Sequence, residues 1–123
     1  MKATELQIGD LVKIKGHLDY DKVQEIARDE NMQWYISFAC SATLFRAYEF
    51  EPIPLTPEIL EKNGWWFDTE DTWRHDEVNF TIEKWNGRYQ CYDINQIKLY
   101  SVHQLQQALR LAGMADMANN FKI

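Results

Sequence analysis

The dipeptide Asn86-Gly87, which lies between two runs of alternating polar and apolar residues, limits the fold of this chain more than any other feature. Asn-Gly is the preferred pair of a two-residue type I′ turn, because both central positions of that turn need a positive φ. Residues 80–85 and 89–93 are therefore predicted to form an antiparallel hairpin. Further short strands that would extend this hairpin to a meander are expected at residues 65–67, 72–74 and 97–100.

Two helices are predicted from the signals at their ends. The first begins after Thr56, whose hydroxyl can cap it, has Pro57 at its first position and can end at Gly64. The second begins after Ser101, where Gln104 can complete a capping box. The apolar stripe of this second helix and the glycine that can end it are Val102, Leu105, Leu109, Ala112 and Gly113.

The first half of the chain contains a series of short strands, which we expect at residues 11–15, 20–26, 34–38 and 47–50. A short sheet of this kind can curl into a small barrel, which leaves no open edge. The opening of SH3-like and KOW-type barrels is similar to one run of this chain, namely Ile8-Gly9-Asp10-Leu11-Val12 followed by Gly16 and Val23.

The segment Glu51-Pro52-Ile53-Pro54 is the predicted boundary, because two prolines hold the chain extended and cannot lie in a central strand. We expect residues 1–53 to form a small β-barrel-like subdomain and residues 54–123 to form an α+β subdomain. The whole chain is then an α+β protein in which a small SH3-like β-barrel is followed by a helix, an antiparallel β-meander and a C-terminal helix packed on it. Residues 114–123 fit either another short helix or a disordered end.

Two segments of the chain match a known pair of motifs. Residues 53–65 match I-P-L-T-x-E-x-L-x-x-x-G-[FW], and residues 102–106 match the first five positions of V-H-Q-L-Q-N-L. Together they resemble a family of short uncharacterised proteins of bacterial genomes and prophage regions. The chain departs from this pattern at Ser101, which is inserted between the usual Tyr and Val, and at Gln107, where Asn is common. The resemblance implies a bacterial or phage-derived origin and a shared architecture, but no particular activity.

The charge of the chain disfavours nucleic acid as a partner. Its 13 basic and 19 acidic residues give a net charge of -6, which repels polyphosphates. The candidate nucleic-acid contacts are Lys13 and Lys15, which alternation places on one strand face, although such a face is more often simply solvated. The chain shows no apolar segment typical of a signal peptide or of a membrane span, which needs about 18 apolar residues. We therefore expect a cytoplasmic protein that contacts no membrane.

No catalytic or metal-binding motif is recognisable, so we predict that the chain is not an enzyme and holds no cofactor. Cys40 and Cys91 lie outside any C-x-x-C motif and are interpreted as buried thiols. An enzyme would require His75 or His103 to meet a carboxylate and Cys91 in space. A cluster of mostly acidic residues could be considered as a metal site: Asp68, Glu70, Asp71, His75, Asp76 and Glu77. The spacing of this cluster is neither that of an EF-hand nor that of a zincin, and we interpret it as a solvated loop.

Aromatic residues, at 14% with five Trp, are the one enriched class. Trp65, Trp66 and Phe67 cannot all face one side of a strand, so at least one of them must point away from the core. The candidate partner-binding residues are Trp65, Trp66 and Trp73, together with His103, Gln106 and Gln107 on the predicted polar face of the last helix. The alternatives are ordinary core packing, or a ligand cage at the barrel mouth made by Trp34, Tyr35, Phe38, Tyr48 and Phe50.

These observations favour a non-enzymatic protein–protein interaction or accessory module of bacterial or prophage origin. The reasons are the lack of catalytic groups, the surplus of aromatic residues and the acidic balance. The alternative is a nucleic-acid-associated phage or mobile-element protein that would use Lys13 and Lys15.

Overall fold

The computed structural model describes residues 2–16, 20–38, 41–46, 49–69, 71–91 and 97–123. The chain divides into two compact units, Met1–Ile53 and Pro54–Ile123. Among the described residues, each unit contains one antiparallel sheet of five strands, accompanied by one 3₁₀ turn in the first unit and by three α-helices in the second. The predicted α+β class is therefore confirmed.

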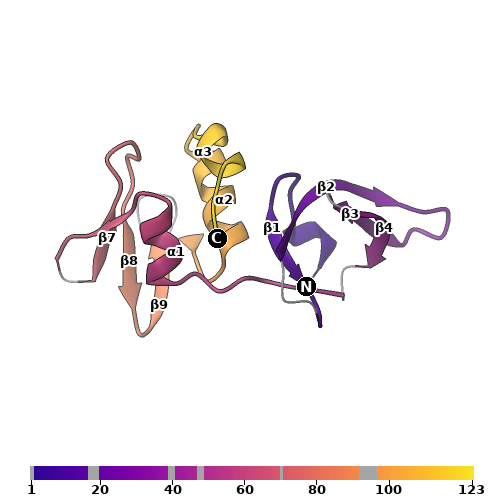
Figure 1. Cartoon of the computed structure of the whole chain (residues 1–123), viewed down its shortest axis with the longest axis horizontal. Coiled ribbons are helices and arrows are strands. Elements are labelled where there is room, and N and C mark those ends of the chain that lie inside the picture. Colours follow the sequence, from indigo (N-terminus) through magenta and orange to yellow (C-terminus); the bar gives the residue numbers. More distant parts are fainter. Residues whose placement is uncertain (1, 17–19, 39–40, 47–48, 70, 92–96) are drawn as a thin grey trace. The chain divides into compact units, whose positions relative to one another are not determined.

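The first unit is built around a meander whose last strand returns to the first. In the described part of this unit the strand order is β4-β3-β2-β1-β5, with all pairs antiparallel. A short 3₁₀ turn, η1 (Ala3–Glu5), precedes the sheet. The strands, of which Figure 1 labels the first four, are β1 (Leu11–Ile14), β2 (Tyr20–Arg28), β3 (Trp34–Phe38), β4 (Ser41–Arg46) and β5 (Phe50–Glu51).

The predicted SH3-like barrel is not confirmed, because the described strands form an open sheet with β4 and β5 at its two edges. The sheet can bury its inner face without closing, since the chain around η1 adds Ala3 and Leu6 to the same core. The fourth strand also lies earlier than predicted, at Ser41–Arg46, whereas residues 47 and 48 lie outside the described part of the chain. The first residues of β4 are small and do not alternate between polar and apolar types in the sequence. The pairing of β4 with β3 therefore identifies this strand, and the sequence pattern does not.

Apolar side chains of the strands and of the chain around η1 form the core of the first unit: Ala3, Leu6, Val12, Val23, Ile36, Phe38 and Phe50. The rings of Phe38, Phe45 and Phe50 meet edge to face, with centroids 5.2 to 6.2 Å apart. Because Phe38 and Phe50 are almost completely buried, they serve as core residues and not as walls of the predicted ligand cage. Tyr48, another member of that cage, lies outside the described residues.

The second unit consists of a helix, a meander and two further helices. The order of its described strands is β10-β9-β8-β7-β6. Within the described residues, no helix is long and apolar enough to span a membrane. The elements, most of them labelled in Figure 1, are α1 (Pro57–Lys62), β6 (Trp66–Phe67), β7 (Thr72–Arg74), β8 (Ile82–Trp85), β9 (Arg88–Cys91), β10 (Ile97–Lys98), α2 (Val102–Leu111) and α3 (Ala115–Asn119).

The strongest local predictions in this unit are confirmed. Asn86 and Gly87 have φ of 51° and 76°, as a type I′ turn requires, and they join β8 to β9. The hydroxyl of Thr56 accepts the backbone N–H of Ile59 at 3.3 Å and so caps α1. Ser101 and Gln104 form the capping box of α2. The tail, which fitted either a helix or a disordered end, contains the short helix α3.

The C-terminal end of α1 is tied to the end of the chain through Asn63. Its side-chain nitrogen donates to the carbonyl oxygens of Ile59 at 2.8 Å and Lys122 at 2.7 Å. Its side-chain oxygen accepts the backbone N–H of Lys122 at 2.8 Å. The side-chain amide of Asn63 therefore joins the end of α1 to the last residues of the chain, which are far from it in sequence.

His75 packs against the turn that follows α1. Its Nδ1 accepts the backbone N–H of Glu77 at 3.1 Å, so Nε2 carries the proton and donates to the carbonyl oxygen of Asn63 at 3.0 Å. Gly64 has a φ of +84°, and a Cβ atom built on it would lie only 2.7 Å from Nε2 of His75. The turn therefore needs glycine both for its backbone conformation and for the space that the imidazole occupies.

Gly64→Ala is expected to lower the free energy of unfolding by about 2 kcal/mol or more, because it adds a steric clash to an unfavourable φ. Urea unfolding followed by tryptophan fluorescence measures this loss. Gly87→Ala is the matched control, since Gly87 has a φ of +76° but open space around it, and it should cost only about 1 kcal/mol. Equal losses in the two variants would show that the contact with His75 contributes nothing.

Candidate functional site

The register of the second sheet determines which side chains face solvent. Ile82 lies opposite Trp73, and both are buried. The residues that alternate with them must point to the other face. Glu83 lies opposite Gln90, and Trp85 lies opposite Arg88, so these two pairs occupy what we call the outer face of the sheet.

A shallow hollow of about 380 Å³ lies on this outer face, beside the turn between β8 and β9. Trp85 is 65% exposed and Tyr100 is 39% exposed, which is unusual for large aromatic side chains. The residues that line the hollow are Trp85, Asn86, Arg88, Gln90 and Tyr100. It thus combines two aromatic rings, a cation and two amide groups, which come from one short hairpin and from the segment between β10 and α2.

Arg88 is held above one of these rings. Its Cζ lies 5.2 Å from the centroid of the Tyr100 ring, and its Nη1 donates to the Tyr100 hydroxyl oxygen at 3.5 Å. None of the carboxylates in the described part of the chain forms an ion pair with it. A second cation, Lys98, lies on β10 directly opposite Gln90 and is also exposed. The hollow therefore has a positive side.

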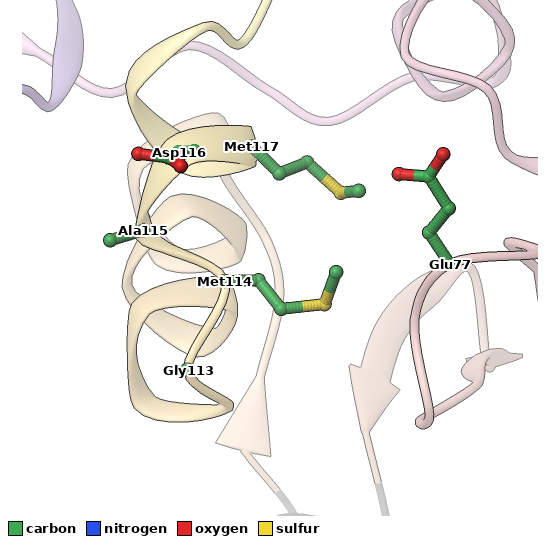
Figure 2. Close-up of a pocket in the computed structure, with 6 residues that line it drawn as sticks. All are labelled: Glu77, Gly113, Met114, Ala115, Asp116 and Met117. Atoms are coloured by element: carbon green, nitrogen blue, oxygen red, sulfur yellow. The ribbon is translucent and has the colours of Figure 1, made fainter.

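A second hollow, of about 330 Å³, lies at the C-terminal end of the unit. Figure 2 shows Met114 and Met117 pointing across it towards Glu77, whereas Ala115 and Asp116 point away. Methionine side chains adapt to irregular apolar surfaces, so this hollow offers soft apolar contact beside one carboxylate. It lacks the aromatic rings and the cation of the first hollow, which we therefore take as the candidate site.

Of the three tryptophans predicted to bind a partner, only Trp66 is exposed. Trp65 and Trp73 are buried, and their rings pack against His75 and Phe67 respectively. Trp66 is 44% exposed, and its Nε1 donates to Oδ1 of Asp76 at 3.1 Å. At least one of Trp65, Trp66 and Phe67 thus points away from the core, as predicted, and Phe67 is exposed as well. Core packing accounts for the other two tryptophans.

The prediction that α2 presents a polar face to solvent is wrong for two of the residues named. His103 is 4% exposed and Gln106 is completely buried. Nε2 of Gln106 donates to the carbonyl oxygen of Ala118 at 3.0 Å, because α3 covers this side of α2. Gln107 is half-buried, so it alone of the three retains partial access to solvent.

The hydroxyl of Ser101 lies 3.0 Å from Nδ1 of His103, a pairing that is also found in hydrolases. Here both residues are buried, and the serine caps α2. A nucleophile must be reached by its substrate, so this pair is better explained as part of the helix N-terminus. Cys91 is buried, as predicted, and Cys40 lies outside the described residues.

The acidic residues around His75 form separate contacts. Asp68 pairs with Arg74 at 2.6 Å, and Asp76 accepts from Trp66. Glu70 lies outside the described residues. In the part of the chain that is described, no three His, Cys, Asp or Glu side chains gather as metal ligands would.

The two lysines of the first unit differ in their surroundings. Nζ of Lys13 lies 3.6 Å from Oε1 of Glu51, its cross-strand neighbour, and Lys15 is exposed just beyond β1. Because a carboxylate already neutralises Lys13, this face offers less positive charge than the sequence indicated.

Sequence reasoning missed Trp85, Arg88 and Tyr100. A signal for Trp85 was present, since alternation along the strand places it on the same face as the charged Glu83 and on the opposite face from the apolar Ile82. A tryptophan in the polar half of an alternating strand is the pattern that would have identified it. Tyr100 had no such signal, because it follows the short strand β10 and its position depends on the path into α2.

A comparison of the chain with protein-family models, curated proteins and solved structures finds no significant match of any of the three kinds.

Gln106→Ala is expected to lower the free energy of unfolding by about 1–3 kcal/mol, because it leaves the buried carbonyl of Ala118 without this donor. Gln107→Ala, one position along the same helix, should cost no more than about 1 kcal/mol. Chemical denaturation of both variants tests this difference. A loss confined to Gln107→Ala would contradict the structural role assigned to Gln106.

Tyr89 lies beneath the outer face, and burial, helped by the carboxylate of Glu58, raises the pKa of its phenol above the ordinary value of 10.0. Its contribution to stability is therefore fully present below pH 10.0 and is lost as the pH rises towards the folded-state pKa. Between about pH 9 and 11 the free energy of unfolding should fall more steeply for the native chain than for Tyr89→Phe. Parallel slopes in urea unfolding would contradict this expectation.

Proposed function

We propose that this chain is a non-catalytic protein-binding module whose contact surface is the outer face of the second sheet. The observation that supports this most directly is the exposed group of Trp85, Arg88 and Tyr100 around one hollow. Trp, Tyr and Arg are the residue types that most often dominate the binding energy of protein interfaces. A domain that needed these rings only for folding would bury them.

The outer face extends beyond the hollow. Trp66 lies opposite Arg74, and Thr72 lies opposite Glu83, so residues of β6 and β7 continue the face that Trp85 occupies on β8. A partner that covered both Trp66 and Trp85 would contact most of the sheet. This supports retaining Trp66 as a partner-binding residue, whereas Trp65 and Trp73 act from the core.

The resemblance of residues 53–65 and of α2 to short bacterial and prophage proteins supports a bacterial or prophage origin for this module and names no activity. Nucleic acid is the weaker candidate. The chain has a net charge of -6, and Lys13 is paired with Glu51. Affinity for nucleic acid depends on several unpaired cations that contact phosphates together.

Trp85→Ala is expected to weaken binding of the natural partner by about 30-fold or more, the effect typical of a central interface residue. The partner would be captured on the full chain from cells of the source organism, purified, and its affinity measured by calorimetry. Leu111→Ala is the control, because Leu111 is equally exposed but lies on α2. Unchanged affinity for Trp85→Ala, with its fold intact by circular dichroism, would contradict the proposal.

A further inference from the structure

The charge of the outer face differs in sign from that of the chain as a whole. The chain has a net charge of -6. On the outer face of β8, β9 and β10, in contrast, the described residues include two cations, Arg88 and Lys98, and one carboxylate, Glu83. A cationic site on an acidic protein favours an acidic partner, because complementary charge both steers association and selects the partner.

We infer that the hollow binds an acidic peptide segment, one of whose carboxylates pairs with Arg88 while a neighbouring side chain packs between Trp85 and Tyr100. This inference rests on the proposed function and names the chemistry of the partner. The guanidinium group has five N–H donors in a planar fork, which matches the two oxygens of a carboxylate. One nitrogen of Arg88 is engaged by Tyr100, and the remaining donors can serve a ligand.

Arg88 is already positioned for such a contact. Stacking on the Tyr100 ring restricts its side chain, so less conformational entropy is lost when a carboxylate binds. The side-chain amide of Asn86, which also lines the hollow, can donate to and accept from the backbone of an extended peptide. The volume of about 380 Å³ suits one or two peptide side chains and not a folded domain.

A nucleic-acid ligand fits the same surface less well. Trp85 and Tyr100 could stack on bases, as aromatic residues do in single-strand binding proteins. Those proteins also track the phosphate backbone with a groove of many cations, whereas here Arg88 and Lys98 share their face with Glu83. The acidic peptide is therefore the better match, and nucleic acid becomes an outcome of the test.

The test is a selection of random heptapeptides, displayed on phage, against the immobilised full chain. The selected peptides should be enriched in Asp and Glu. A fluorescein-labelled synthetic copy of the best peptide should then bind Arg88→Gln about tenfold or more weakly than the native chain in fluorescence anisotropy. Arg46→Gln is the matched control, because Arg46 is also exposed and stacked on a tyrosine, Tyr35, but belongs to the first unit, and it should leave the affinity unchanged.

The possible results separate this inference from the proposed function. Peptides that depend on Trp85 but carry no excess of acidic residues, or that bind Arg88→Gln normally, would overturn the acidic-peptide inference alone. The acidic-peptide inference alone would also be overturned if no peptide binds and Trp85→Ala nevertheless fails to bind the natural partner. Tighter binding of labelled poly(dT) than of any selected peptide would replace the inference by a nucleic-acid site. No peptide binding, together with full retention of the partner by Trp85→Ala, would overturn both proposals.

Discussion

The pairing register of the second sheet is the constraint on which the rest of this unit depends. Successive side chains of a strand point to opposite faces, so a shift of one residue would exchange every buried side chain for an exposed one. In the observed register Ile82 lies in the core while Trp85 and Arg88 face solvent. The turn at Asn86-Gly87 holds this register because both of its residues have a positive φ.

Aromatic residues serve two purposes in this chain. Phe38 and Phe50 pack edge to face inside the first unit, and Trp65 is buried in the second. Burial of a large apolar side chain stabilises a fold by about 1.5–3 kcal/mol, and Trp85 and Tyr100 forgo much of that gain because they remain in water. The proposed contact surface would account for this loss, since the same area would become buried when a partner binds.

The elements of this fold that could be predicted are those with local causes. The cap at Thr56, the capping box at Ser101 and the Asn86-Gly87 turn each involve residues within a few positions of one another. The barrel could not be predicted in the same way, because closure depends on whether two distant edges meet. Gln106 was misassigned for a related reason: α2 has a polar stripe in sequence, but α3 returns to cover it.

The sequence by itself determined the class of the fold, the hairpin and the ends of the two main helices, because short-range sterics and hydrogen bonds decide them. It also determined that at least one of Trp65, Trp66 and Phe67 must leave the core, since neighbours on a strand cannot share one face. Only the tertiary structure decided that Arg88 stacks on Tyr100 and that both border a hollow with Trp85. That arrangement depends on how β10 leads into α2, and such long-range packing has no signature in the order of residues.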